Sequence, residues 1–164
     1  LPILVLTGVL HRDVYSRDKK LIPRDVAATL GISHVTDGEV LIGTELNGLH
    51  IGPLAVATIP GELYPELWLA KPGGGSYIEK PEGGDYPDAT PETPIQASLP
   101  AGVMPVVVNN ANDSLGYIIP KTQFDQAPPF AYGETEEPQY GEQNSVGEEM
   151  GPLVTQEFAA MYGQ

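Results

Sequence analysis

The 164-residue sequence has no cysteine. This absence excludes a disulfide framework, a thiolate metal site and a cysteine nucleophile. The sequence also lacks an apolar run of the ~18 residues that a membrane-spanning helix needs. Its most apolar stretch, residues 1–10, is interrupted by Pro2 and Gly8. We therefore expect a buried strand in that stretch and no transmembrane segment.

Basic residues are scarce, with eight Lys and Arg against 22 Asp and Glu, and the net charge is -14. A field of this sign repels phosphate backbones and anionic membranes, so we expect no nucleic acid partner. Five of the basic residues, against Asp13 and Asp18, lie in the first 24 positions. This basic segment is typical of a solvated loop, and the alternative is docking against an acidic neighbour.

Glycine and proline are abundant, at 19 and 17 residues, which predicts extensive turns and loops and excludes an all-helical bundle. The 41% of hydrophobic residues against 18% of charged ones predicts a packed core. We expect an α/β fold, a mixed β-sheet with flanking short helices and long Pro/Gly-rich loops. The chain begins at Leu1, so we expect a processed product or a piece of a longer protein.

The first half of the chain predicts strands and one hairpin. Residues 3–6 and 9–15 are typical of core strands, and a short helix is expected over 24–30, before Gly31. Residues 39–46 alternate apolar and polar positions up to Asn47-Gly48, the favoured type I′ turn, which predicts a hairpin with a second arm over 49–59. Because residues 54–59 are apolar on both faces, we expect them in the centre of a sheet covered on both sides.

The second half predicts short elements separated by two irregular arms. A helical turn anchored by Trp68 is expected within residues 62–70, and a helix is expected over 152–162. A buried strand over 103–108, a polar turn over 109–114 and an apolar stretch over 115–119 lie between the arms. The arms themselves cover about 71–100 and 127–149.

The three histidines, His11, His34 and His50, show no close helical pairing of the kind that zinc hydrolases use. His34 is expected in a turn, and His11 and His50 lie in apolar strand contexts, where a hydrogen-bonded structural histidine is the ordinary interpretation. The sequence has no Gly-x-Ser-x-Gly elbow and no phosphate-binding loop. Enzyme classes that depend on either of these motifs therefore lose support.

Two places at strand ends could carry chemistry. Glu62 follows an apolar strand through Pro60-Gly61, and could ligate a metal or merely cap the next helix. The turn from Asn109 to Ser114, with Tyr117 after it, could face the same crevice or serve as ordinary Asx-turn chemistry. Asn112-Asp113-Ser114 also matches the N-glycosylation sequon.

Residues from about Val40 to Phe158 resemble the later part of the catalytic domain of the neutral/alkaline non-lysosomal ceramidase family. The stretch Leu49-His-Ile-Gly-Pro-Leu-Ala-Val-Ala-Thr-Ile-Pro-Gly-Glu62 is similar to a strand of that family that runs into Pro-Gly-Glu or Pro-Ala-Glu. Ala111-Asn-Asp-Ser-Leu-Gly-Tyr117, with Lys121-Thr-Gln-Phe124 after it, is similar to its Asn-x-Tyr-x-x-Tyr segment. Ser145 to Pro152 lies near a Gly-Pro that precedes the final helix of the family.

The resemblance implies a zinc-dependent hydrolase of lipid amides such as ceramide, with zinc held by two histidines, a glutamate and a tyrosine. It assigns the glutamate ligand to Glu62. Ser114 stands where the family has its metal-binding tyrosine, and Tyr117 matches the second tyrosine of that motif. Our candidate metal ligands are therefore Glu62 and Tyr117, and nothing here matches the family's histidines or nucleophile segment.

Two ligands do not complete a zinc shell, which needs at least three from protein. The chain is then either one domain over 1–164 or the C-terminal part of a larger catalytic domain. Catalysis would need the N-terminal part of the same protein or a partner chain, and a homo-oligomer is one form of such an assembly. The alternative is a non-catalytic, acidic, secreted assembly module whose arms wrap neighbouring subunits. Acidity, sequon and resemblance together favour an extracellular or periplasmic location.

Overall fold

The computed structural model describes residues 14–16, 21–22, 40–42, 44–132 and 139–162. The chain divides into two compact units, Leu1–Thr44 and Glu45–Gln164, and each is described by itself. The strand predicted over 3–6, the helix predicted over 24–30, His11 and His34 lie outside the described residues.

The first unit contains a small antiparallel sheet. Its strands are β1 (Val14–Ser16), β2 (Leu21–Ile22) and β3 (Val40–Ile42), in the order β2-β1-β3. β3 lies within the predicted first arm of the hairpin, but it pairs with β1, where Val14 is opposite Ile42.

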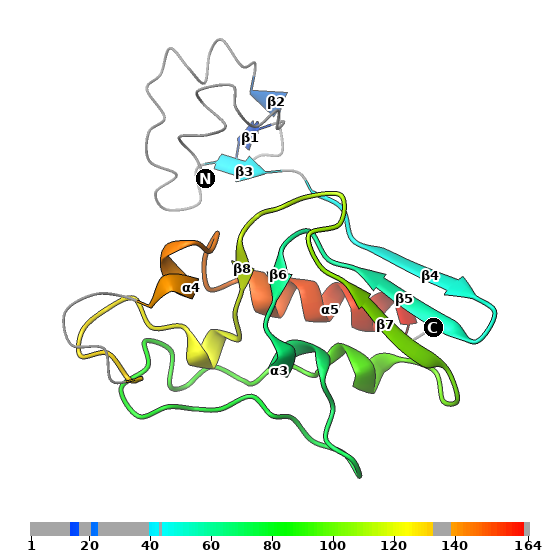
Figure 1. Ribbon diagram of the computed structural model, residues 1–164. Coiled ribbons are helices and arrows are strands. Elements are labelled where there is room, and N and C mark those ends of the chain that lie inside the picture. Colours follow the sequence, from blue (N-terminus) through cyan, green and yellow to red (C-terminus); the bar gives the residue numbers. More distant parts are fainter. Residues whose placement is uncertain (1–13, 17–20, 23–39, 43, 133–138, 163–164) are drawn as a thin grey trace. The chain divides into compact units, whose positions relative to one another are not determined.

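The sheet of the second unit is mixed, as expected for the α/β class (Figure 1). β5 (Leu54–Thr58) lies between β4 (Asn47–Ile51), to which it is antiparallel, and β7 (Met104–Val108), to which it is parallel. The predicted central position of residues 54–59 is confirmed. The parallel pairing requires a long crossover, and the chain between β5 and β7 provides it.

The hairpin turn lies further along the chain than predicted. Asn47 and Gly48 lie inside β4, and the connection to β5 is Gly52-Pro53. Gly52 has a φ of 59°, which a type II′ turn requires at its first central position, and the ring of Pro53 fixes the negative φ of the second. The prediction of a turn at Asn47-Gly48 was wrong, because Gly48 lies within β4 against Tyr162 and the turn is at Gly52-Pro53.

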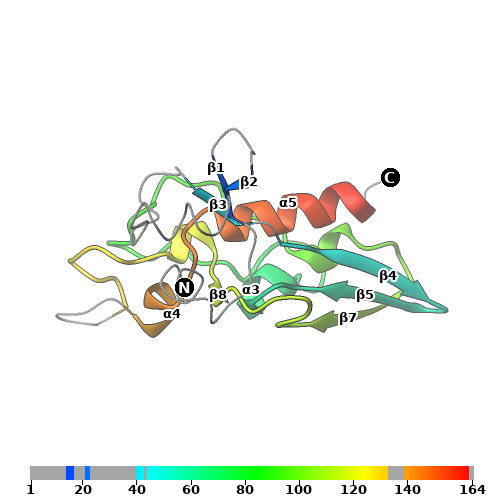
Figure 2. The same ribbon diagram turned by 90° about the horizontal axis from the view of Figure 1, so that it is seen from above.

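The two faces of this sheet differ. Gly48, Ala55 and Ala57 lie on the inner face, over which α5 (Met150–Tyr162) packs, and both alanines are fully buried (Figure 2). The predicted C-terminal helix is thus confirmed, and its Phe158 is buried in the same core cluster as Ala57.

The opposite side, which we call the outer face, has no helix of residues 45–164 over it in Figure 2, and at one end of it the Asn112 side chain reaches Thr58. The strand registers place on it the following positions: Asn47, Leu49, Ile51, Leu54, Val56, Thr58, Met104, Val106 and Val108. The predictions that residues 54–59 are covered on both sides and that residues 103–108 form a buried strand were wrong for this face. Met104 is 60% exposed and Val108 44%.

Short elements close the rest of the core. α3 (Pro65–Trp68) begins with Pro65, where a missing N–H is tolerated, and Trp68 is buried as predicted. The first irregular arm contains a single 3-10 turn, η1 (Ile95–Ser98), and the second contains α4 (Tyr140–Gln143). No helix among the described residues is long and apolar enough to cross a membrane.

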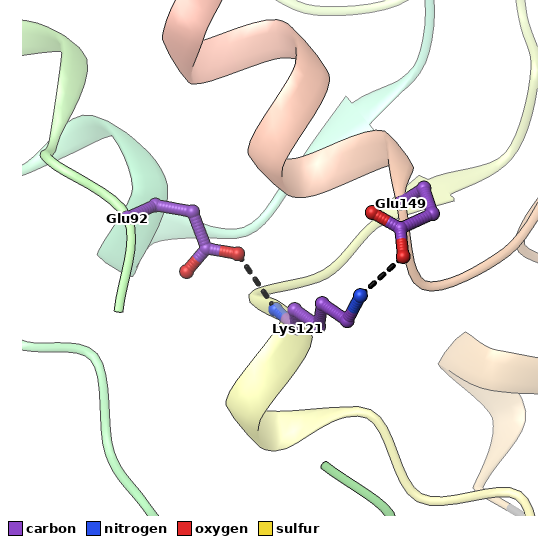
Figure 3. Close-up of polar contacts among 3 residues, drawn as sticks. All are labelled: Glu92, Lys121 and Glu149. Atoms are coloured by element: carbon purple, nitrogen blue, oxygen red, sulfur yellow. Dashed lines mark hydrogen bonds and ion pairs between the residues drawn. The ribbon is translucent and has the colours of Figure 1, made fainter. Parts of the chain in front are cut away.

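The arm over 71–100 is fastened to its own chain at η2 (Lys121–Gln123). Thr122 donates a hydrogen bond to the carbonyl of Glu79, and the buried Glu92 carboxylate accepts the Lys121 backbone N–H at 2.8 Å. The Lys121 ammonium in turn pairs with Glu149, just before α5 (Figure 3). These contacts join the arm, η2 and the start of α5.

Candidate functional site

The two candidate metal ligands lie side by side on neighbouring strands. Glu62 opens β6 (Glu62–Leu63) and Tyr117 opens β8 (Tyr117–Ile118), and the two strands pair in parallel with Glu62 opposite Tyr117. The sequence separates these residues widely, and the fold brings them together as predicted for one crevice. Since Glu62 belongs to a strand and α3 is capped by Tyr64, the interpretation of Glu62 as a helix cap was wrong.

The Pro60-Gly61 turn positions β6 by close backbone approach. The Glu62 N–H donates to the Gly116 carbonyl at 2.9 Å, and the Leu115 N–H donates to the Pro60 carbonyl at 2.8 Å. A Cβ atom at Gly61 would collide with the Gly116 carbonyl oxygen. Glycine is therefore needed at position 61 for β6 and β8 to pair.

Gly116 has the same role on the other strand. Its φ of 92° lies in the region that favours glycine, and a Cβ there would collide with the Asn144 carbonyl. That carbonyl accepts the Tyr117 N–H at 3.0 Å, and Tyr117 also forms a β-bridge to Ser145. The segment after α4 thus holds Tyr117 from the side away from Glu62.

The exposed Glu62 carboxylate lies beside the Tyr117 phenol. Partial burial, followed by the nearby charge of Glu62, raises the pKa of the Tyr117 phenol above its ordinary value of 10. Tyr117 is therefore a neutral donor at physiological pH.

Two further tyrosines surround Tyr117. Tyr64 and Tyr140 pack edge-on against its ring, with ring centroids 6.1 and 5.7 Å apart from it. Burial, followed by the charge of Glu142, raises the pKa of Tyr64 to about 12. The sequence reasoning missed both residues. The signal for Tyr64 was its spacing, because a residue two positions after Glu62 in extended backbone lies on the same side.

The polar turn after β7 uses its Asn, Asp and Ser side chains for hydrogen bonds within the turn, which is ordinary Asx-turn chemistry. The Ser114 N–H donates to Asp113 Oδ1 at 2.9 Å, and the Ser114 hydroxyl donates to Asn110 Oδ1 at 3.2 Å. Asn110 and Asn112 have φ values of 52° and 66°, which Asn tolerates better than most residues. The hydroxyl of Ser114 is thus engaged within its own turn, and the hydroxyl opposite Glu62 is the phenol of Tyr117.

Histidine contributes nothing to this arrangement in the described part of the chain. His50 lies exposed on β4, and its ring contacts Tyr162 edge-on at 5.9 Å. His50 thus lies on a strand as expected, and its contact there is the ring of Tyr162.

Carboxylate and phenol oxygens are donors that zinc accepts, but two donors are fewer than the three it needs. Within the described ranges, no group of three or more His, Asp or Glu side chains could hold a metal ion. These residues alone therefore do not fit a complete zinc site.

We compared this chain with models of protein families, with curated proteins and with solved structures, and no family, protein or structure matches it.

Proposed function

We propose that this chain is the C-terminal portion of a ceramidase-like, zinc-dependent amidohydrolase that acts on a lipid amide. In this proposal Glu62 and Tyr117 supply two metal ligands. The remaining ligands and the nucleophile segment come from an N-terminal part of the same protein or from a partner chain. The observation that carries the proposal is the parallel β6–β8 pairing, which places Glu62 opposite Tyr117.

The position of the two side chains on paired strands supports the ligand assignment. The resemblance puts Ser114 at the position of the family's metal-binding tyrosine and matches Tyr117 to the second tyrosine of that motif. The contact of the Tyr117 phenol with Glu62, and the engagement of Ser114 with Asn110, favour Tyr117.

When bound with its missing ligands, zinc would supply Lewis-acid activation of the amide carbonyl and of a water molecule. The residues of this chain would hold one side of the site. Tyr64 and Tyr140 limit the rotation of the Tyr117 ring, and Gly61 and Gly116 allow the backbone approach that fixes the distance between the two strands.

The test is the zinc content of the assembled native protein, purified with its partner or as the longer chain. Glu62→Gln should lower the bound zinc and the hydrolysis of a fluorescent ceramide at least tenfold, because loss of a charged ligand weakens a metal site strongly. Tyr117→Phe should also lower the bound zinc and the hydrolysis, but by a smaller factor. Glu157→Gln, at an exposed carboxylate on α5, is the matched control and should change neither quantity.

Unchanged zinc content and unchanged amidase activity in the Glu62 variant would contradict the proposal. The denaturing intact mass of the native material gives a second test. A single species near 17.5 kDa with no second chain would also contradict it, because this sequence does not complete the zinc shell.

A second candidate function is a non-catalytic, acidic, secreted assembly module derived from the same fold. The observation that favours it is the donor count of two at the site, together with Ser114 at the position of a ligand tyrosine. Here the irregular arms, about 71–100 and 127–149, would contact neighbouring subunits. We propose an extracellular or periplasmic location for either function, on the acidity and the sequon at Asn112.

Limited proteolysis of the native assembly separates the two candidates. The module proposal expects both arms to resist cleavage until the assembly is dissociated. Rapid cleavage in both arms of the intact assembly would contradict it.

A further inference from the structure

Three tyrosine rings meet at steep angles beside the start of β8, and we call Tyr64, Tyr117 and Tyr140 the tyrosine trio. The Tyr117 ring plane is inclined by 80° to that of Tyr64 and by 73° to that of Tyr140, with centroids 6.1 and 5.7 Å apart. Two such rings form a corner, in which a cation can lie within about 6 Å of both centroids, the reach of a cation–π interaction. The trio therefore has walls suited to a cation.

The trio is open to solvent on the side of α4. The Tyr140 side chain is 71% exposed, whereas Tyr64 and Tyr117 are half-buried. The Gly141 backbone lies so close to the Tyr64 hydroxyl that a Cβ atom there would collide with it. This close approach brings the first residues of α4 against the end of the Tyr64 ring, and a ligand could reach the rings past Tyr140.

The surroundings of the trio are negatively charged. The exposed Glu62 lies beside the Tyr117 phenol, and the charges of Glu142 and Glu66 act on the Tyr64 phenol. Glu66 Oε2 is buried and accepts no hydrogen bond from the described residues. A buried carboxylate oxygen without a donor is costly, so a cation close to it would stabilise the site.

Two other tyrosines show how the chain treats an aromatic ring near its own lysines. Lys71 lies over the Tyr77 ring and Lys121 over the Tyr86 ring, each with Nζ 5.2 Å from the centroid. In the described part of the chain, no lysine lies over a ring of the trio. The trio thus combines ring faces and negative charge with no such cation of its own.

We propose that the tyrosine trio binds a methylated ammonium group of a small organic ligand. Ring faces attract such a diffuse positive charge, and its methyl groups can pack on them without needing hydrogen-bond acceptors. A bare metal ion fits the trio less well, because no group of three or more His, Asp or Glu in the described ranges could hold one. The proposal does not rest on the zinc site, since the ligand would contact ring faces and zinc would contact oxygens.

The test is a proton NMR titration of tetramethylammonium chloride with the full 164-residue chain. Sodium chloride keeps the ionic strength constant, so the general attraction of cations to a chain of charge -14 does not vary. We expect the methyl resonance to move upfield and saturate, because a ring face shields protons that lie over it. The dissociation constant should be on the order of 1 to 10 mM, as suits an exposed site. Neopentyl alcohol has the same shape without the charge, and it should bind at least tenfold more weakly.

Three variants locate the binding on the trio. Tyr140→Leu removes one wall at an exposed position and should weaken binding about two- to fivefold. Tyr140→Phe keeps the ring and should bind like the unmodified chain. Tyr77→Leu removes a tyrosine that is 45% exposed and whose ring already lies under Lys71, so this matched control should leave the affinity unchanged.

A methyl resonance that does not shift and saturate would overturn the proposal. Equal affinity for the neutral alcohol would overturn it as well, because the site would then recognise shape and not charge. An affinity that Tyr140→Leu leaves unchanged would place the binding elsewhere. Equal weakening by Tyr140→Phe and Tyr140→Leu would assign the contact to the hydroxyl and contradict binding by the ring face.

Discussion

The two faces of the β4-β5-β7 sheet differ in the size of their side chains and in what covers them. At the centre of the sheet the inner face has Ala55 and Ala57, which are fully buried, and the outer face has Leu54 and Val56, which are half-buried. At these central positions the smaller side chains are the buried ones. Burial in this sheet is therefore decided by which layer lies over a face, and side-chain size by how closely that layer approaches.

The close approach of α5 explains the small residues. The Tyr162 hydroxyl donates to the Val56 carbonyl at 3.1 Å, and its ring stacks on Phe158 with the planes 12° apart. A larger residue at position 48 would occupy the space of the Tyr162 hydroxyl. The large apolar side chains of the outer face have no such neighbour among the described residues.

The largest expected effect on stability comes from truncating a buried side chain on the covered side of the sheet. Phe158→Ala should lower the free energy of unfolding by about 3–5 kcal/mol, because Phe158 is fully buried and the change leaves a cavity. Met104→Ala on the outer face should cost less than about 1 kcal/mol in the monomer, since exposed positions are usually tolerant. Urea unfolding at a concentration where the chain is monomeric measures both.

Equal losses in the two variants would break the comparison. They would show that the outer face is covered within the single chain.

A smaller effect is expected at the point of closest approach. Gly48→Ala should cost about 1 kcal/mol, because its Cβ would lie 2.8 Å from the flexible Tyr162 hydroxyl and force that side chain to move. In a Tyr162→Phe background the same change should cost less. The measurement is a double-mutant cycle by urea unfolding, and additive losses would argue against a direct contact between the two positions.

The smallest effect is a pH dependence of the covered side. Burial raises the pKa of Tyr162 above 10, so the folded chain holds this proton more tightly than the unfolded chain. The resulting stability is complete below pH 10 and is lost as the pH rises through the raised pKa. Tyr162→Phe should therefore weaken the loss of stability above pH 10. The outer face has no titratable side chain and adds nothing to this dependence.

Tyr64, with a pKa of about 12, titrates in the same range. The quantity to measure is thus the difference between the unmodified chain and the Tyr162 variant, followed by urea unfolding from pH 9 to about 11.5. A difference that does not change with pH would contradict the assignment to Tyr162.

Much of the second unit was predictable because local patterns and tertiary structure agree. The apolar run over 54–59, the Pro65 helix start and the C-terminal periodicity all describe elements that the fold retains. The turn prediction at Asn47-Gly48 was wrong because this dipeptide is a strong turn signal on local grounds alone. Its glycine serves the contact with Tyr162, which lies at the far end of the sequence.

The site was predictable in part. The resemblance identified Glu62 and Tyr117, and the strand ends suggested one crevice, but no local pattern gives the pairing of β6 with β8. Tyr140 and Glu142 reach the site from α4, inside an arm expected to be irregular. Side chains that arrive from such segments leave no periodic signal, because their placement depends on backbone contacts such as that of Asn144 with Tyr117.

The parallel ladder between β5 and β7 also bears on the order in which the chain folds. β4 and β5 are joined by a two-residue turn, so their hairpin can form within microseconds. β7 joins only after the whole segment 59–103 has closed into a loop, which is a slow, non-local step. Until then one edge of β5 has unpaired backbone groups. Conditions that populate this stage should favour aggregation through that edge.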